Sequence, residues 1–323
     1  MDRISELTNK VLNGGKISKK EALELYDQPI DRLCESADRI RKHFCSDKFD
    51  ICTIVNAKSG HCSEDCKFCA QSSYNNTHIS EYLLMDIDEI VRQAKFNYEQ
   101  GVLRYSIVTS GRKLSDNEVD KMCEAVSRVI DEVGLSVCVS FGLLDKKQFS
   151  KLKEAGVTRV HNNLEASEKY FPHICTTHNF DDKVKAIRNA QEVGLTVCSG
   201  GIMGLGESVE DRIDMALSLR ELDITSVPVN MLNAIDGTPF AKNERINDDE
   251  MRRIVAVYRF ILPNASIRLA GGRGLLADKG RACFVSGANS VISGDMLTTS
   301  GITTKDDLSM ISELGYKVGL CNE

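Results

Sequence analysis

Four helical segments of this 323-residue chain end in the same way, at a glycine that leads straight into a β-rich segment. The glycines are Gly101, Gly134, Gly156 and Gly194, which close the sequences EQG, EVG, EAG and EVG. A glycine that ends a helix directly before a strand is typical of the helix-to-strand junction in parallel β/α proteins. This recurrence limits the choice of fold more than any other feature of the sequence.

Short β-rich segments alternate with helical stretches along most of the chain. There are eight of them, at 51–57, 103–110, 135–142, 158–165, 195–201, 224–232, 266–272 and 289–294. The pattern predicts an α/β fold, a (β/α)8 TIM-type barrel with its active site at the carboxyl ends of the strands. An open, doubly wound sheet is the alternative. Residues 1–45 read as an N-terminal helical extension, and residues 46–323 as one catalytic domain.

The composition narrows the class of partner. A formal net charge of −6 gives no basic surface for nucleic acid or for an anionic membrane, so small molecules are the expected ligands. No signal peptide or apolar run of transmembrane length is visible, which predicts a cytoplasmic protein. Twelve cysteines in a reducing compartment are expected to be free, catalytic or metal-bound.

Strand alternation predicts an unusually polar barrel interior. Residues two apart share a face of a strand, and one face collects thiols, amides and charges: Cys52, Asn56, Arg104, Ser106, Cys138, His161, Asn163, Glu165, Cys198, Gly200, Asn230 and Arg268. Barrel interiors are normally filled by branched apolar side chains, so this face predicts a barrel that holds polar ligands. The alternative is that the opposite face points inward.

Three cysteines follow the first strand in the sequence CSEDCKFC, at Cys62, Cys66 and Cys69. A structural zinc site needs a fourth ligand, and the one histidine just before the run, His61, is crowded against Cys62. Three thiolates from one loop instead suit three irons of a cubane iron-sulfur cluster, with the fourth iron open.

This loop resembles the C-x3-C-x-aromatic-C motif of radical S-adenosylmethionine enzymes. From about residue 30 to about 300 the chain is similar to the biotin synthase family, most specifically in VCSGGIMGLGES, SVPVNML, IRLAGGR and CFVSGANSVISG. The resemblance implies a 4Fe-4S cluster on Cys62, Cys66 and Cys69, with S-adenosylmethionine on its open iron. It also implies S-adenosylmethionine contacts for several residues: Phe68, Asn163, Glu165, Gly200 and Gly201.

The resemblance also implies substrate contacts. Asn230 corresponds to an asparagine that binds the ureido ring of dethiobiotin. His161 stands where the family has an asparagine near the substrate, and Glu165 stands where an aspartate is expected. These two departures leave the cofactor chemistry in place and leave the pose of the substrate open.

A second, auxiliary iron-sulfur cluster supplies the sulfur in this family. Cys138, Cys198 and Arg268 match three of its ligands, whereas the fourth position holds Ser106 instead of cysteine. Our hypothesis is that Cys52, on the neighbouring strand, replaces the missing thiolate, in a 2Fe-2S or a four-iron cluster. The alternative is that Cys52 is a small buried hydrophobe. The direction of the loop that carries Cys175 is unreadable from sequence, which makes Cys175 a weaker candidate ligand.

The implied reaction is sulfur insertion into dethiobiotin to give biotin, with two molecules of S-adenosylmethionine consumed. This chemistry implies an electron donor such as flavodoxin or ferredoxin, and the family resemblance implies a homodimer. Two alternatives remain at this point: a related radical enzyme that rearranges or matures its substrate without inserting sulfur, and a structural zinc-binding module.

Overall fold

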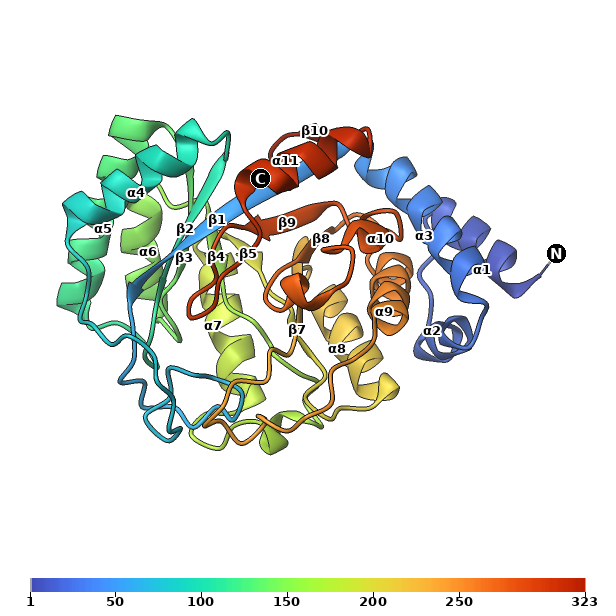
Figure 1. Cartoon of the computed structure of the whole chain (residues 1–323), viewed down its shortest axis with the longest axis horizontal. Coiled ribbons are helices and arrows are strands. Elements are labelled where there is room, and N and C mark those ends of the chain that lie inside the picture. Colours follow the sequence, from blue (N-terminus) through green and yellow to red (C-terminus); the bar gives the residue numbers. More distant parts are fainter. Residues whose placement is uncertain (1, 323) are drawn as a thin grey trace.

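The strands of the computed structural model, which describes residues 2–322, close into a parallel barrel (Figure 1). Each strand pairs in parallel with the next, and β9 returns to β1 through the pair Asp50 and Ser290. The barrel strands are β1 (Lys48–Lys58), β2 (Arg104–Thr109), β3 (Ser136–Ser140), β4 (Arg159–His161), β5 (Thr196–Cys198), β7 (Ser226–Met231), β8 (Ser266–Leu269) and β9 (Ser290–Ser293). The predicted eight-stranded barrel is confirmed, and the open sheet is excluded.

Two short strands lie outside the predicted set. β6 (Gly201–Met203) pairs with the carboxyl half of β7, so the single predicted segment 195–201 is divided between β5 and β6. β10 (Lys317–Val318) pairs with the first two residues of β1. Both strands depend on pairing with distant residues, which the local sequence pattern does not report.

Helices surround the barrel on the outside (Figure 1). They are α4 (Ile87–Glu99), α5 (Asp116–Val133), α6 (Lys146–Glu154), α7 (Phe180–Glu192), α8 (Val209–Glu221), α9 (Asp248–Ile261), α10 (Arg281–Phe284) and α11 (Thr304–Glu313). The predicted glycine junctions are confirmed, since Gly101, Gly134, Gly156 and Gly194 all have positive φ, between 77° and 101°. Among the described residues, no helix has both the length and the apolar character needed to span a membrane.

Three N-terminal helices form the predicted extension, α1 (Arg3–Leu12), α2 (Lys19–Tyr26) and α3 (Ile30–Cys45). They lie to one side of the barrel, where α3 packs on α9 and α2 on α8 and α9 (Figure 1). Their apolar residues belong to the same hydrophobic core as the barrel helices. The extension is therefore docked on the barrel, and a domain boundary between residues 45 and 46 stays a prediction.

Candidate functional site

The barrel interior holds two cavities, one above the other. The upper one measures about 350 Å³ and opens at the carboxyl ends of the strands. The lower one, of about 20 Å³, lies deeper, and Ile54 and His161 border both. Seven predicted inward residues line the lower cavity: Cys52, Arg104, Ser106, Cys138, His161, Cys198 and Arg268. The predicted inward face of the strands is therefore right, and the alternative, in which the opposite face points inward, is excluded.

The three-cysteine loop lies over the upper cavity, which Phe68 and Cys69 line. Its backbone is fixed by two hydrogen bonds, from Cys62 N to Gln71 O at 3.1 Å and from Ser73 N to Cys62 O at 2.9 Å. His61 points away from the three thiols, because its side chain is 68% exposed and pairs with Glu81 at 3.2 Å. The loop thus presents three thiols and no imidazole of its own, a donor set that fits a three-thiolate cluster.

A chain of polar side chains runs along β4 and its carboxyl end. His161 Nε2 lies 2.8 Å from Asn163 Oδ1, and Asn163 Nδ2 donates to Glu165 Oε2 at 3.3 Å. Burial lowers the pKa of His161 to about 4, although its contact with Asn163 opposes the shift. Burial raises the pKa of Glu165. All three residues line the upper cavity, so the structure brings these predicted cofactor and substrate residues together.

Gly200 lies between β5 and β6 beside this chain of side chains, and Gly201 is the first residue of β6. A Cβ on Gly200 would lie 1.9 Å from Pro228 O, and one on Gly201 would lie 2.5 Å from Glu165 O. The missing side chains are therefore required by the close approach of the protein's own backbone. A contact between these glycines and S-adenosylmethionine remains a prediction, and Ile202 is the neighbouring residue that lines the cavity.

Asn230 lines the upper cavity from β7. Its Nδ2 donates to Gly201 O at 3.1 Å, and its Oδ1 accepts from Gly271 N at 2.9 Å. An amide group has two donor hydrogens and an acceptor oxygen with two lone pairs. One hydrogen and one lone pair remain for a ligand, while the backbone contacts hold the amide in a fixed orientation.

The lower cavity gathers thiols from opposite sides of the barrel. Arg268 Nη1 donates to Cys52 Sγ at 3.2 Å, and Ser226 Oγ donates to Cys198 Sγ at 3.2 Å. Ser106 and Cys138 are register partners on β2 and β3. Burial raises the pKa of Cys138 to about 12 and also raises that of Cys52. Without a metal the thiols of Cys52 and Cys138 are therefore protonated at neutral pH.

Two charged residues that the sequence analysis missed, Asp50 and Arg159, lie with Arg104 and Arg268 beside this cavity. Asp50 is fully buried and lies 3.1 Å from Arg268, 3.5 Å from Arg104 and 3.7 Å from Arg159. Three buried guanidinium groups face one carboxylate, an arrangement that favours an anionic group such as a thiolate-bound cluster nearby. Asp50 lies on the same strand face as Cys52, and Arg159 lies on the same strand face as His161. Extending the alternation two residues toward the start of each strand would have found both residues.

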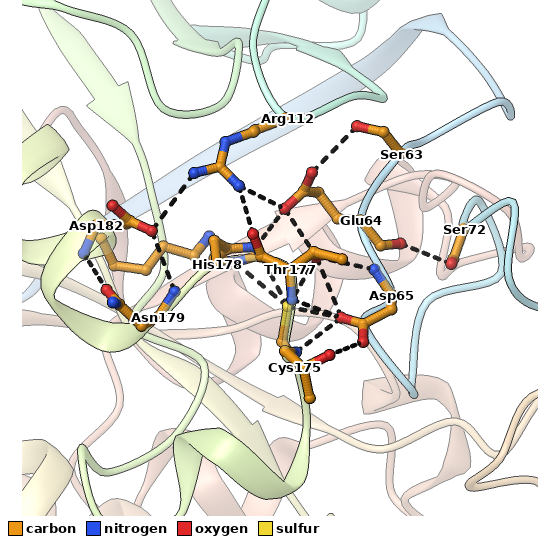
Figure 2. Close-up of polar contacts among 12 residues, drawn as sticks. Ser63, Glu64, Asp65, Ser72, Arg112, Cys175, Thr177, His178, Asn179 and Asp182 are labelled. Atoms are coloured by element: carbon orange, nitrogen blue, oxygen red, sulfur yellow. Dashed lines mark hydrogen bonds and ion pairs between the residues drawn. The ribbon is translucent and has the colours of Figure 1, made fainter.

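A segment after β4 is bound to the three-cysteine loop through acidic residues of that loop (Figure 2). Asp65 accepts hydrogen bonds from the backbone N–H groups of Thr176 at 2.8 Å and Thr177 at 3.1 Å. Glu64 accepts from His178 Nδ1 at 2.6 Å. These contacts place Cys175, whose direction the sequence did not reveal, beside the loop.

Sequence comparison identifies the family. Residues 58–219 match the Radical SAM superfamily, and residues 228–317 match the Biotin and Thiamin Synthesis associated domain. The chain is 56% identical to the biotin synthase of Brachyspira hyodysenteriae over 317 residues, which cover 98% of this chain and 95% of that protein. It belongs to the biotin synthase family. Biotin synthase 2 of Corynebacterium diphtheriae is 55% identical over 321 residues, 99% of this chain and 97% of that protein.

Solved structures support the fold. Methylornithine synthase superposes with a TM-score of 0.84 at 21% identity, covering 97% of each chain. The hydrogenase maturase HydG of Carboxydothermus hydrogenoformans gives 0.82 at 18% identity, covering 99% of this chain and 80% of that one. Family membership makes the chain a radical S-adenosylmethionine enzyme with a 4Fe-4S cluster. It also rejects the structural zinc-binding module.

Proposed function

We propose that this chain forms biotin by inserting sulfur into dethiobiotin, and that Cys62, Cys66 and Cys69 hold the cluster that starts the reaction. When bound, the 4Fe-4S cluster and S-adenosylmethionine supply a 5′-deoxyadenosyl radical that removes hydrogen from carbon. The observation that carries the proposal is the stacking of the two sites. The three-cysteine loop covers a cavity whose floor leads to a second group of thiols.

The upper cavity is proposed to bind the reactants. Its volume of about 350 Å³ lies within the range of small-molecule pockets. The Glu165 carboxylate offers acceptors for the ribose hydroxyls of S-adenosylmethionine, and Phe68 offers a flat face for its adenine. Asn163 offers one amide hydrogen, because its Oδ1 already accepts from His161 Nε2 and from Gly200 N. Asn230 has one free donor and one free acceptor for the ureido ring of dethiobiotin. His161 is uncharged at neutral pH and donates from Nε2 to Asn163 Oδ1, which leaves Nδ1 as an uncharged acceptor for the substrate.

The lower cavity is proposed to hold the auxiliary cluster. Cys52, Cys138 and Cys198 would supply three thiolates, which bind iron far better than the Ser106 hydroxyl does. Arg268 is an ion-pair partner of Asp50 and donates to Cys52. In this arrangement the positive charge of Arg268 stabilises the thiolates. Arg268 also lies close enough to the lower cavity to contact the cluster directly, which is the ligand role that the family resemblance implies.

One experiment tests the function as a whole. The chain, reconstituted with iron and sulfide under anaerobic conditions, is incubated with dethiobiotin, S-adenosylmethionine and a reductant, and biotin is measured. Biotin is the expected product. Release of 5′-deoxyadenosine without biotin would keep the radical chemistry and reject both the substrate and sulfur insertion, in favour of the related enzymes without sulfur insertion.

A second experiment tests the ligands of the auxiliary cluster. The Cys52→Ser variant should lose iron and sulfide equivalent to one cluster, together with the optical and Mössbauer signals of that cluster. Cys123→Ser, a half-buried thiol on α5 far from both cavities in sequence and fold, is the matched control and should keep the full iron content. An unchanged auxiliary cluster in Cys52→Ser would reject its role as a ligand.

The remaining partners follow from the same proposal. One-electron reduction of the cluster requires a low-potential donor of the flavodoxin or ferredoxin kind. A homodimer and a cytoplasmic location are retained as predictions, and gel filtration with light scattering tests the first of them.

A further inference from the structure

A thiol that is not one of the proposed cluster ligands, Cys175, lies opposite Cys66 of the three-cysteine loop. Asp65, directly before Cys66, accepts a hydrogen bond at 2.8 Å from the backbone N–H of the residue that follows Cys175. Lys67, directly after Cys66, donates its backbone N–H at 2.9 Å to the carbonyl of Ile174, which precedes Cys175. The two segments therefore run past each other in opposite directions, with the two cysteines face to face between the two hydrogen bonds.

The distance between the two sulfur atoms suits a disulfide. The Sγ atoms of Cys66 and Cys175 lie within 4.8 Å of each other. A disulfide bond of about 2.05 Å requires each sulfur to move by less than about 1.5 Å from there. The flanking hydrogen bonds already hold the two backbones side by side, so rotation of the side chains about their Cα–Cβ bonds closes the gap.

The contacts around Cys175 tolerate such a bond (Figure 2). Only the hydrogen bond from Cys175 Sγ to Asp65 Oδ1, at 3.2 Å, is lost with the thiol proton, and Asp65 keeps its two backbone donors. Cys175 Sγ also lies 3.2 Å from His178 Nδ1, but the proton on that nitrogen is held by Glu64 Oε2 at 2.6 Å. The hydrogen bond between His178 and Glu64 therefore stays as it is.

Burial gives the two thiols different roles. Cys175 is 3% exposed, whereas Cys66 is partly exposed. A small oxidant therefore reaches Cys66 first, and Cys175 is the buried neighbour that reacts second. In the proposed enzyme the cluster occupies Cys66, so this thiol is open to oxidation only while the cluster is absent.

We propose that Cys66 and Cys175 form a reversible disulfide in the cluster-free chain, and that this bond blocks cluster assembly until it is reduced. The oxidant is a low-molecular-weight disulfide. The Cys66 thiolate attacks one of its sulfurs and releases one thiol, and the Cys175 thiolate then attacks the Cys66 sulfur and releases the second thiol. The two cysteines are oxidised, the small disulfide is reduced, and the two cysteine protons end on the released thiols. The block rests on the proposed cluster role of Cys66, whereas disulfide formation does not.

Disulfide formation is tested first. The full-length, cluster-free chain is treated with oxidised glutathione, its free thiols are alkylated, and it is digested with trypsin without reductant. Trypsin places Cys66 in peptide 59–67 and Cys175 in peptide 170–183. Mass spectrometry should find these two peptides joined, and dithiothreitol should separate them.

Two variants identify the sulfurs involved. Cys62→Ser leaves Cys66 as the one cysteine of peptide 59–67 and should keep the link. Cys175→Ser should lose the link and instead hold glutathione on Cys66, because the second thiolate is missing. A link in folded wild type between Cys66 and any cysteine other than Cys175 would overturn the proposal, and so would a chain without any link at Cys66.

The urea unfolding midpoint gives an independent check and shows that each variant is folded. A link between residues 66 and 175 restricts the unfolded chain over a long loop, so oxidation should raise the midpoint of wild type. The midpoint of Cys62→Ser should rise equally, and that of Cys175→Ser should not rise. A rise of the same size in Cys175→Ser would contradict the assignment.

The block of cluster assembly is tested second. Oxidised and reduced wild-type chains, freed of glutathione, are offered a preformed 4Fe-4S cluster on an iron-sulfur scaffold protein without free thiols or sulfide. The re-isolated oxidised chain should lack the iron of one cluster, in proportion to its share of joined peptides, and dithiothreitol should restore it. Equal iron in both chains would reject the block. Failure of the reduced chain to bind a cluster would instead reject the proposed role of the loop and leave the disulfide standing.

Discussion

Asp50 is the carboxylate on which three buried arginines converge, so its removal tests what stabilises the floor of the barrel. The Asp50→Asn substitution keeps the size and shape of the side chain and removes its charge. Arg268, Arg104 and Arg159 would then share the buried floor without a carboxylate. The backbone N–H of Cys321, which donates to Asp50 Oδ2 at 3.2 Å, would keep an oxygen acceptor only in one amide orientation.

The size of the effect follows from burial. Breaking a buried ion pair by removing one partner costs about 3–5 kcal/mol, because the remaining charge is uncompensated. At about 2 °C per kcal/mol, the value for large domains, the midpoint of thermal unfolding should fall by about 6–10 °C. Glu192→Gln is the matched control, since its pair with Lys146 at 3.0 Å is more than half exposed and should contribute about 0–1 kcal/mol.

The pH dependence gives a second, independent check. Burial alone would raise the pKa of Asp50, but Arg268, Arg104 and Arg159 outweigh it and hold this pKa below its usual value. A carboxyl group with a lowered pKa in the folded state stabilises the fold above its unfolded pKa of about 3.9. That stabilisation is lost as the pH falls further, so wild type and Asp50→Asn should converge in acid.

The assay is urea unfolding of the cluster-free chain from pH 3 to pH 8, followed by circular dichroism. The reasoning is refuted if Asp50→Asn loses less than about 1 kcal/mol at neutral pH, as the control should. A difference from wild type that stays constant down to the lowest pH would also contradict it.

Three further substitutions test local features, each by urea unfolding. Gly200→Ala places a Cβ 1.9 Å from Pro228 O and should cost at least about 1–3 kcal/mol, whereas Gly274→Ala, with no atom within 4 Å of the added Cβ, should be nearly neutral; equal losses would contradict this. His161, with a pKa lowered to about 4, binds fewer protons folded than unfolded, so wild-type stability should fall between pH 6.5 and 4. His161→Asn should lack that fall, and parallel pH profiles would refute the assignment. Ser115→Ala removes the capping box of α5 and should cost about 1 kcal/mol; an unchanged midpoint would show that the cap is dispensable.

The barrel strands were predictable because their signals are local. Alternation along each strand and a glycine after four of the helices are properties of neighbouring residues, so all eight strands and the inward face followed from the sequence. The predicted strand at 51–57 began too late, however, because an aspartate such as Asp50, directly before the apolar residues, is more typical of a loop than of a strand. The structure extends β1 back to Lys48, which puts Asp50 on the same face as Cys52.

The candidate site was predictable in most of its residues, Asp50 and Arg159 excepted, but not in its contacts. The spacing of Cys62, Cys66 and Cys69 indicated a cluster loop, and strand alternation indicated the deeper thiols. Neither pattern states which atoms meet across the barrel. The approach of Arg268 to Cys52 depends on the closure of β9 onto β1 and on pairing between β8 and β9.

The sequence by itself determined the barrel, its polar interior and the three-thiol loop, because periodicity and ligand spacing are properties of adjacent residues. Only the tertiary structure decided that one carboxylate faces three arginines and that Cys175 and His178 lie beside Cys66. Those groups come from segments up to 218 positions apart, as between Asp50 and Arg268. Their proximity is set by strand register and barrel closure, which no local pattern records.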